Sequence, residues 1–120
     1  MLSPACARRK EQLEQGLKAV LRQLQDGYRP EKVILFGSLA TGDIGEWSDL
    51  DLALIKPTDK PYFDRIEELV ELCDYPVATD FLVYTPEEFE YESRNNPFVR
   101  EEIHRKGKVV YDASQGPLAS

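Results

Sequence analysis

Three aspartates, Asp49, Asp51 and Asp80, are the residues whose type and spacing favour chemistry in this sequence. Asp49 and Asp51 are two positions apart at the start of an expected strand, so both side chains project from the same face. Neighbouring carboxylates repel each other and raise each other's pKa unless a cation lies between them. Magnesium is held in proteins by one or two carboxylates together with substrate phosphates. The pair therefore predicts a magnesium site.

Asp80 supplies a third acidic group. It lies within the otherwise apolar run 77–84, which we expect to form a further strand. A carboxylate inside such a strand is unfavourable unless it is paired or binds a metal. If this strand lies beside the expected strand Leu50–Ile55, Asp80 reaches the same face as the aspartate pair. Taken singly, each acid also fits a solvated strand end, so the prediction depends on the combination.

Gly37 and Ser38 follow a short apolar strand, 33–36, and ten residues separate Ser38 from Asp49. A glycine lets the chain turn sharply and lets a ligand approach the backbone closely. Ser38 then stands where a helix would begin, and its hydroxyl and the first free N–H groups form a cradle for phosphate. Gly37 and Ser38 therefore fit a phosphate-binding turn, whereas a Gly-Ser pair after a strand, taken on its own, is only a turn.

The remaining pattern predicts the elements that must position these residues. An amphipathic helix carries apolar residues at helical spacing and ends near Gly27, and the segment before it, with Cys6, is expected to fray. A second helix, 59–74, is expected to bury a stripe of five residues. These stripes are Leu13, Leu17, Val20, Leu21 and Leu24 in the first helix and Phe63, Ile66, Leu69, Val70 and Cys73 in the second.

A capping box at Thr85, with Pro86 at the first helical position, marks the start of a further helix. Another short helix is expected over 96–107, followed by an edge strand at 108–111. The alternation of strands and helices predicts an α/β (α+β) fold, with a small mixed sheet flanked by helices.

Size and composition limit the class of protein. The 120 residues predict one domain, 1–112, followed by a loose tail, 113–120. No apolar run approaches the ~20 residues that span a membrane, and no secretory signal opens the chain, so we expect a cytoplasmic protein. The net charge of −7 argues against binding of a long nucleic acid, because such proteins neutralise phosphates with Lys and Arg.

The combined pattern resembles the DNA polymerase beta-like nucleotidyltransferase superfamily, and most closely its minimal (MNT-type) branch. The resemblance runs from about residue 33 to 111 and implies that family's fold. It implies that Gly37 and Ser38 bind the donor's terminal phosphates and that Asp49 and Asp51 hold magnesium, of which two ions are expected. The resemblance also implies that Asp80 is the third carboxylate of the catalytic and metal-binding set and helps to activate the attacking hydroxyl.

The resemblance also implies a reaction and a partner. The donor is ATP or another NTP, and AMP moves to a hydroxyl of a protein or small-molecule acceptor with release of pyrophosphate. Minimal nucleotidyltransferases resemble antitoxins that modify a HEPN-domain protein with AMP, so a HEPN-domain protein is the expected partner. The alternative is a non-catalytic module that neutralises such a partner by contact. The acceptor, the preferred base and a homo-oligomeric state stay open.

One departure from the family pattern concerns the glycine loop. Relatives often carry an arginine before the second glycine of this loop, where it binds phosphate, whereas this chain has Leu39 and Thr41. The basic residues that could supply the missing charge are Arg29, Lys32 and Lys56.

Overall fold

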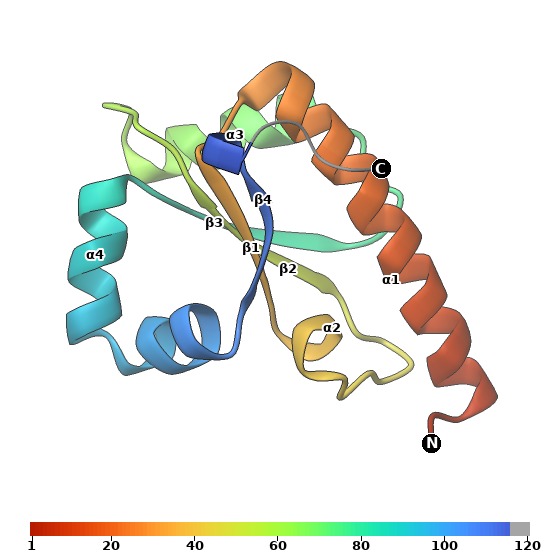
Figure 1. The fold of residues 1–120 in the computed structure, drawn as a ribbon. Helices are drawn as coiled ribbons and strands as arrows, with labels where there is room; N and C mark the ends of the chain where they lie inside the picture. Colours follow the sequence, from red (N-terminus) through yellow and green to blue (C-terminus); the bar gives the residue numbers. More distant parts are fainter. Residues whose placement is uncertain (116–120) are drawn as a thin grey trace.

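The computed structural model describes residues 1–115, and its centre is a four-stranded sheet with the strand order β3-β2-β1-β4 (Figure 1). The elements are α1 (Pro4–Gln23), η1 (Leu24–Tyr28), β1 (Lys32–Phe36), α2 (Ser38–Thr41), β2 (Leu50–Ile55), α3 (Tyr62–Leu72), β3 (Thr79–Tyr84), α4 (Pro86–Asn95), η2 (Val99–Arg105), β4 (Lys108–Asp112) and η3 (Ala113–Gln115). Of the expected tail, residues 113–115 form the short turn η3, and 116–120 lie outside the described residues.

The sheet is mixed, as the sequence predicts. β1 pairs with β2 and with β4 in antiparallel orientation, whereas β2 and β3 run parallel. The strand predicted over Leu50–Ile55 coincides with β2, and β4 forms the expected edge strand. The α/β (α+β) fold class is confirmed.

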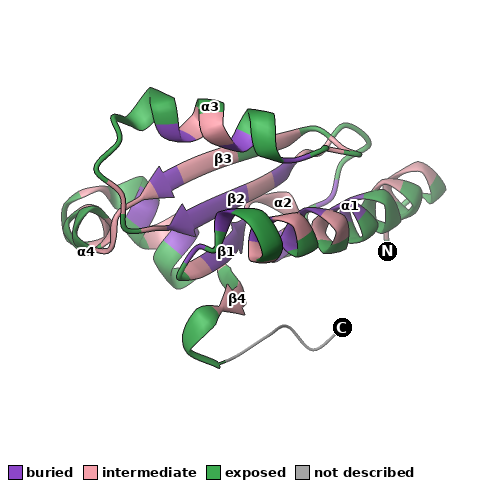
Figure 2. Ribbon diagram, turned by 90° about the horizontal axis from the view of Figure 1, so that it is seen from above, coloured by how far each residue is buried: buried purple, intermediate pink, exposed green. Residues whose placement is uncertain are grey.

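Alternation along the strands gives the sheet two different faces. On one face, which we call the α1 face, the strand residues pack with α1 and α3, and Leu50, Leu52 and Leu54 are fully buried there. On the other, the α4 face, Ile34, Phe36 and Ala53 pack against η2, with Phe89 of α4 beside them. Figure 1 shows α1 and α4 on opposite sides of the sheet, and Figure 2 shows that the burial follows the strands.

The expectation that the N-terminal segment frays is wrong. The side chain of Ser3 accepts a hydrogen bond from the N–H of Cys6, and Pro4 occupies the first helical position, where its missing N–H has no consequence. The helix therefore begins at Pro4 and brings the residues before Leu13 into ordered structure.

The buried stripe predicted for α3 is partly wrong. Leu69 and Cys73 are buried, but the side chains of Phe63 and Val70 are 83% and 60% exposed. Arg65 lies on the buried side of α3 instead. Apolar residues occur on two sides of this helix, and the side that packs is the one where Arg65 finds partners.

Those partners join α3 to β3 and α4. Arg65 Nη1 donates to Glu88 Oε1 at 2.6 Å and to the carbonyl of Val83 at 3.2 Å. Glu88 also completes the capping box, because its carboxylate accepts from the N–H of Thr85 while the Thr85 hydroxyl accepts from the N–H of Glu88. The hydrogen bond from Arg65 lowers the pKa of Glu88. One carboxylate thus starts α4 and neutralises a buried guanidinium.

Within residues 1–115 the helices are all too short or too polar to cross a membrane.

We predict that Glu88→Ala lowers the free energy of unfolding by about 2 kcal/mol, because it leaves a buried guanidinium without its carboxylate. Glu87→Ala is the matched control: it removes an exposed acid from the same helical turn and should change stability by no more than about 0.5 kcal/mol. Urea unfolding of both variants measures the difference. Equal losses would contradict the role assigned to the ion pair.

Candidate active site

Asp51 and Asp80 are direct neighbours on the parallel strands β2 and β3. Adjacent strands lie roughly 4.8 Å apart, and both residues follow the alternation that directs Leu50 and Leu52 to the α1 face, so both carboxylates project on the α4 face. Asp51 is partly buried and Asp80 is exposed. The structure therefore brings Asp80 beside Asp51, on the face expected for strands that lie side by side.

Gly37 places the glycine bend directly against Asp51. β1 ends at Phe36, which is the antiparallel partner of Asp51, and Gly37 follows with a φ of 77°. A Cβ atom on Gly37 would lie 2.2 Å from Asp51 Oδ2, so the carboxylate of Asp51 would have to leave its position. Only glycine fits both the backbone conformation and this approach.

Ser38 begins α2 beside this bend. The carbonyl of Gly37 accepts hydrogen bonds from the N–H groups of Ala40 and Thr41, both at 3.1 Å. The N–H groups of Ser38 and Leu39 belong to the first turn, which has no preceding carbonyl within the helix to bind them. These donors follow directly on Gly37, which lies against Asp51, and such free N–H groups suit a phosphate held close to a metal site.

Asp49 lies just before β2, between two fixed neighbours. Leu50 is fully buried, and its N–H donates to the carbonyl of Ala78 at 3.0 Å. On the other side, Ser48 belongs to a tight loop that starts at Gly45. The side chain of Asp49 is 46% exposed, so it stays accessible to a ligand.

Burial, together with the negative charges of Asp80 and Asp49 and a side-chain hydrogen bond with Asp80, raises the pKa of Asp51 to about 6. Within residues 1–115, no three acidic, histidine or cysteine groups are gathered closely enough to hold one ion by themselves. The neighbouring carboxylates Asp51 and Asp80 do fit magnesium, which needs only one or two carboxylates when substrate phosphates complete its ligands.

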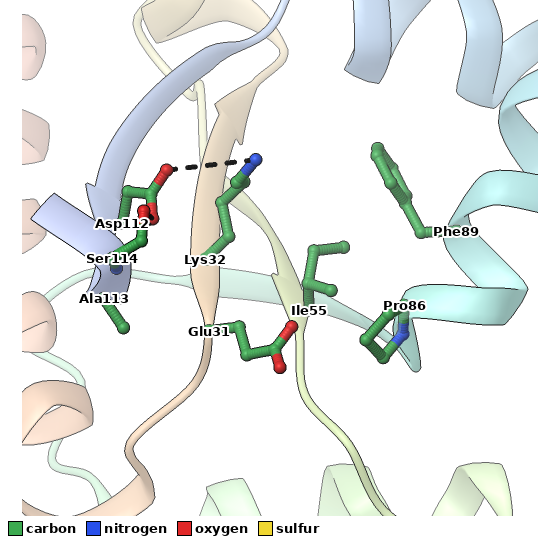
Figure 3. Close-up of a pocket in the computed structure, with 8 residues that line it drawn as sticks. All are labelled: Glu31, Lys32, Ile55, Pro86, Phe89, Asp112, Ala113 and Ser114. Carbon is green, nitrogen blue, oxygen red and sulfur yellow. Dashed lines mark hydrogen bonds and ion pairs between the residues drawn. The ribbon is translucent and has the colours of Figure 1, made fainter.

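The three basic residues proposed to replace the missing loop arginine lie elsewhere. Lys32 starts β1 opposite Ile55, at the other end of the strands from Asp51. Its Nζ lies 4.0 Å from Asp112 Oδ2, and both residues line a cavity of about 700 Å³ (Figure 3). Lys56 follows β2 at that same end and donates to the carbonyl of Tyr28, next to Arg29. That expectation is therefore wrong.

Arg9 is the residue near the site that the sequence interpretation missed. Its Nε donates to the carbonyl of Ser48 at 2.8 Å, and its Nη2 lies 3.9 Å from Asp49 Oδ1. The sequence shows Arg9 as part of a short basic cluster. Its position in the sequence could have indicated this, because Arg9 stands four residues before the buried Leu13 and so lies on the same side of α1, one turn earlier.

A mixed sheet with a glycine bend ending one strand and an Asp-x-Asp pair opening the next is the arrangement that the resemblance to nucleotidyltransferases implied. Residues 16–112 match the family described as "Nucleotidyltransferase domain". The chain therefore belongs to this family and is an enzyme of nucleotidyl transfer.

Individual relatives agree with this assignment. The chain is 31% identical over 102 residues to a Methanocaldococcus jannaschii protein named "Putative protein adenylyltransferase MJ0604", a match that covers 82% of this chain and 97% of the relative. The crystal structure of a "putative nucleotidyltransferase" from Sulfolobus solfataricus superposes with a TM-score of 0.67 at 16% identity, covering 99% of this chain and 97% of the other. The second comparison shows the fold alone.

We predict that Gly37→Ala destabilises the protein by about 3 kcal/mol, because backbone strain adds to the overlap with Asp51. Gly42→Ala is the control: its φ of 90° is also positive, but nothing lies within 4 Å of the added atom, so the loss should be about 1 kcal/mol. Combining Gly37→Ala with Asp51→Gly should recover about 1 kcal/mol in a double-mutant cycle measured by urea unfolding. Strict additivity would contradict the close approach.

A further prediction concerns pH. The pKa of Asp51 in the folded protein, about 6, exceeds its ordinary value of 3.8, so ionisation of Asp51 costs stability as pH rises through 6, and the cost is absent below pH 3.8. Without divalent cations, Asp51→Asn should therefore raise the free energy of unfolding at pH 8 by about 1 kcal/mol, after discounting for solvent screening of a partly exposed group.

Thermal unfolding in EDTA at pH 8 and pH 4.5 measures this difference, which should shrink at the lower pH. Asp43→Asn changes an exposed acid of the neighbouring loop and serves as the control, with no comparable gain. An Asp51→Asn variant that is no more stable than wild type at pH 8 would show that the three carboxylates do not repel one another.

Proposed function

We propose that the protein is a magnesium-dependent adenylyltransferase of the cytoplasm that transfers AMP from ATP to a hydroxyl group of a protein. The observation that carries this proposal is the placement of Asp51 and Asp80 on adjacent parallel strands, with the Gly37 bend against Asp51. The carboxylates repel one another and therefore favour a bound cation, and the backbone N–H groups beside them favour an anionic ligand. Magnesium triphosphate has both properties.

The donor would be held by two kinds of group: backbone and hydroxyl donors on one side, and carboxylates with magnesium on the other. Gly37 allows the triphosphate to approach the backbone, and the first-turn N–H groups and hydroxyl of Ser38 offer hydrogen bonds to its terminal phosphates. Asp49, Asp51 and Asp80 would hold magnesium, two ions in the fully loaded enzyme, which neutralises the charge of the triphosphate and of the departing pyrophosphate. Leu39 and Thr41 add no charge, so the backbone and the bound cation carry phosphate recognition.

The chemical step is a displacement at the α-phosphorus of ATP. The acceptor oxygen forms a bond to this phosphorus while the bond to the β-phosphate oxygen breaks, and pyrophosphate leaves with that electron pair. The proton of the acceptor hydroxyl passes to the carboxylate of Asp80, because Asp80 is exposed whereas Asp49 and Asp51 are partly buried. Asp49 and Asp51 would hold the magnesium that binds the donor.

A protein acceptor is favoured over a nucleic acid. The net charge of −7 opposes binding of a long phosphate backbone, and the M. jannaschii relative is named for transfer to protein. By the resemblance to minimal nucleotidyltransferases, the acceptor is a HEPN-domain partner and this chain acts as its antitoxin. A chain that neutralises this partner by contact alone is the competing function, because the glycine loop lacks an arginine.

The test is transfer of label from ATP carrying ³²P at the α-position. The protein, isolated together with its bound partner, is incubated with magnesium and this ATP, and we expect the partner polypeptide to become labelled. ATP labelled at the γ-position should leave it unlabelled, because the γ-phosphate departs in pyrophosphate. Asp49→Asn and Asp51→Asn should each reduce labelling by more than about 100-fold, since metal ligands matter at least as much as the groups that orient them.

Asp43→Asn is the matched control, because it neutralises an exposed acid of the same loop region and should leave labelling unchanged. Full labelling by both Asp49→Asn and Asp51→Asn would refute the assignment of these residues. A stable complex with the partner and no labelling under any condition would favour the contact-only function.

A further inference from the structure

The side chain of Arg9 is more buried than those of its neighbours. It is 21% exposed, whereas Arg8 and Lys10 on either side are both exposed residues of α1. Burying a guanidinium is unfavourable unless its donors are satisfied, because the charged head prefers water. The position of Arg9 therefore depends on the groups that it contacts.

Those groups lead directly to the aspartate motif. Nε donates to the carbonyl of Ser48 at 2.8 Å, a distance typical of a strong hydrogen bond. Nη1 donates to Gln12 Oε1 at 3.2 Å, which fixes the guanidinium plane from within α1, and Nη2 lies 3.9 Å from Asp49 Oδ1. Figure 1 shows the loop between α2 and β2 reaching toward the N-terminal half of α1.

The hydrogen bond from Arg9 acts on the N-terminal side of Asp49, where the backbone is held by fewer contacts than on the C-terminal side. On its C-terminal side, Leu50 is fixed by the hydrogen bond of its N–H to Ala78 and by complete burial. On its N-terminal side, Ser48 is otherwise held by the loop's own hydrogen bonds, from the N–H of Gly45 to Ser48 Oγ at 2.8 Å and from the N–H of Ser48 to the carbonyl of Gly45 at 3.3 Å. That loop is exposed from Gly45 to Trp47, and the side chain of Trp47 is 85% exposed.

We infer that Arg9 is a positioning residue, which holds the backbone at Ser48 so that the Asp49 carboxylate is presented to the metal and nucleotide. The role in ligand binding rests on the proposed function, whereas the role in ordering the loop does not. Arg9 lies before residues 16–112, the part of the chain that matches the family.

A different effect of the same side chain would have the opposite sign. A guanidinium beside Asp49 also offsets its negative charge and would compete with a bound cation. The distances decide between the two: the 2.8 Å hydrogen bond to the carbonyl of Ser48 is short and directed, while the ion pair at 3.9 Å to a half-exposed carboxylate is weakened by solvent screening. Positioning therefore dominates.

The test uses two replacements that retain the apolar stem of Arg9 and a control on its neighbour. Arg9→Met removes the guanidinium, Arg9→Lys keeps a charge without the planar fork, and Arg8→Ala removes an exposed charge next to it. Binding of Mn²⁺ in the presence of a non-hydrolysable ATP analogue is measured by electron paramagnetic resonance. Hydrogen exchange of the amides of Gly45, Ser48 and Leu50 is measured by NMR in the metal-free protein.

We expect Arg9→Met to weaken Mn²⁺ binding about 10-fold, the usual effect of removing a group that orients a metal ligand. Arg9→Lys should weaken it to a smaller extent, and Arg8→Ala should leave it unchanged. Exchange of the Gly45 and Ser48 amides should become faster in Arg9→Met but not in Arg8→Ala, with the melting temperature showing that the fold is retained.

Three outcomes would overturn the inference. Unchanged Mn²⁺ binding with unchanged exchange would mean that Arg9 only docks α1 on the domain. Tighter Mn²⁺ binding by Arg9→Met would mean that Arg9 competes with the cation. Weaker binding by Arg8→Ala to the same extent would point to net charge. If the wild-type protein binds no Mn²⁺, the proposed function fails instead, and the exchange of the loop amides alone decides whether Arg9 orders the loop.

Discussion

The structure depends on the forced proximity of carboxylates at one end of a parallel strand pair. Register places Asp51 beside Asp80, and Asp49 adds a third negative charge close by. Like charges at the spacing of neighbouring strands destabilise the fold, so strand pairing and core packing must hold them there. The same β2 residues that alternate with the acids supply this packing, because Leu50, Leu52 and Leu54 are completely buried on the α1 face. A cation is then the natural ligand, since its binding relieves a repulsion already present in the fold.

This arrangement could be predicted from the sequence because it is encoded locally. The alternation of leucine with aspartate specifies both the strand and the face on which the carboxylates project, and a glycine after an apolar run specifies the bend. The helix between β2 and β3 is a connection long enough for parallel strands, although the sequence leaves the pairing of these two strands as a condition. With that condition, these features together indicated that Gly37, Asp51 and Asp80 share one site.

The features that the sequence could not provide depend on partners far along the chain. The buried side of α3 was misassigned because Phe63 and Val70 fit a helical stripe, whereas Arg65 is selected by Glu88, 23 positions away. In the same way, Arg9 is defined by Ser48, 39 positions away. No local pattern reports such pairs, and the basic residues proposed for phosphate binding failed for the same reason: spacing does not tell which end of a sheet a residue reaches.

The two ends of the sheet thereby have different electrostatic roles. At the end away from the motif, charged groups are paired or hydrogen-bonded: Arg65 with Glu88, Lys32 with Asp112, and Lys56 with the carbonyl of Tyr28. At the motif end the aspartates face one another, and Arg9 is the basic side chain that approaches them within 4 Å. The paired charges at the first end leave the fold stable enough to tolerate the repulsion among the aspartates at the motif end. Binding sites are often built in this way, at the expense of folding free energy. Because Arg9 comes from the N-terminal half of α1, 39 positions before Ser48, the order of the motif depends on a helix that is remote from it in the sequence.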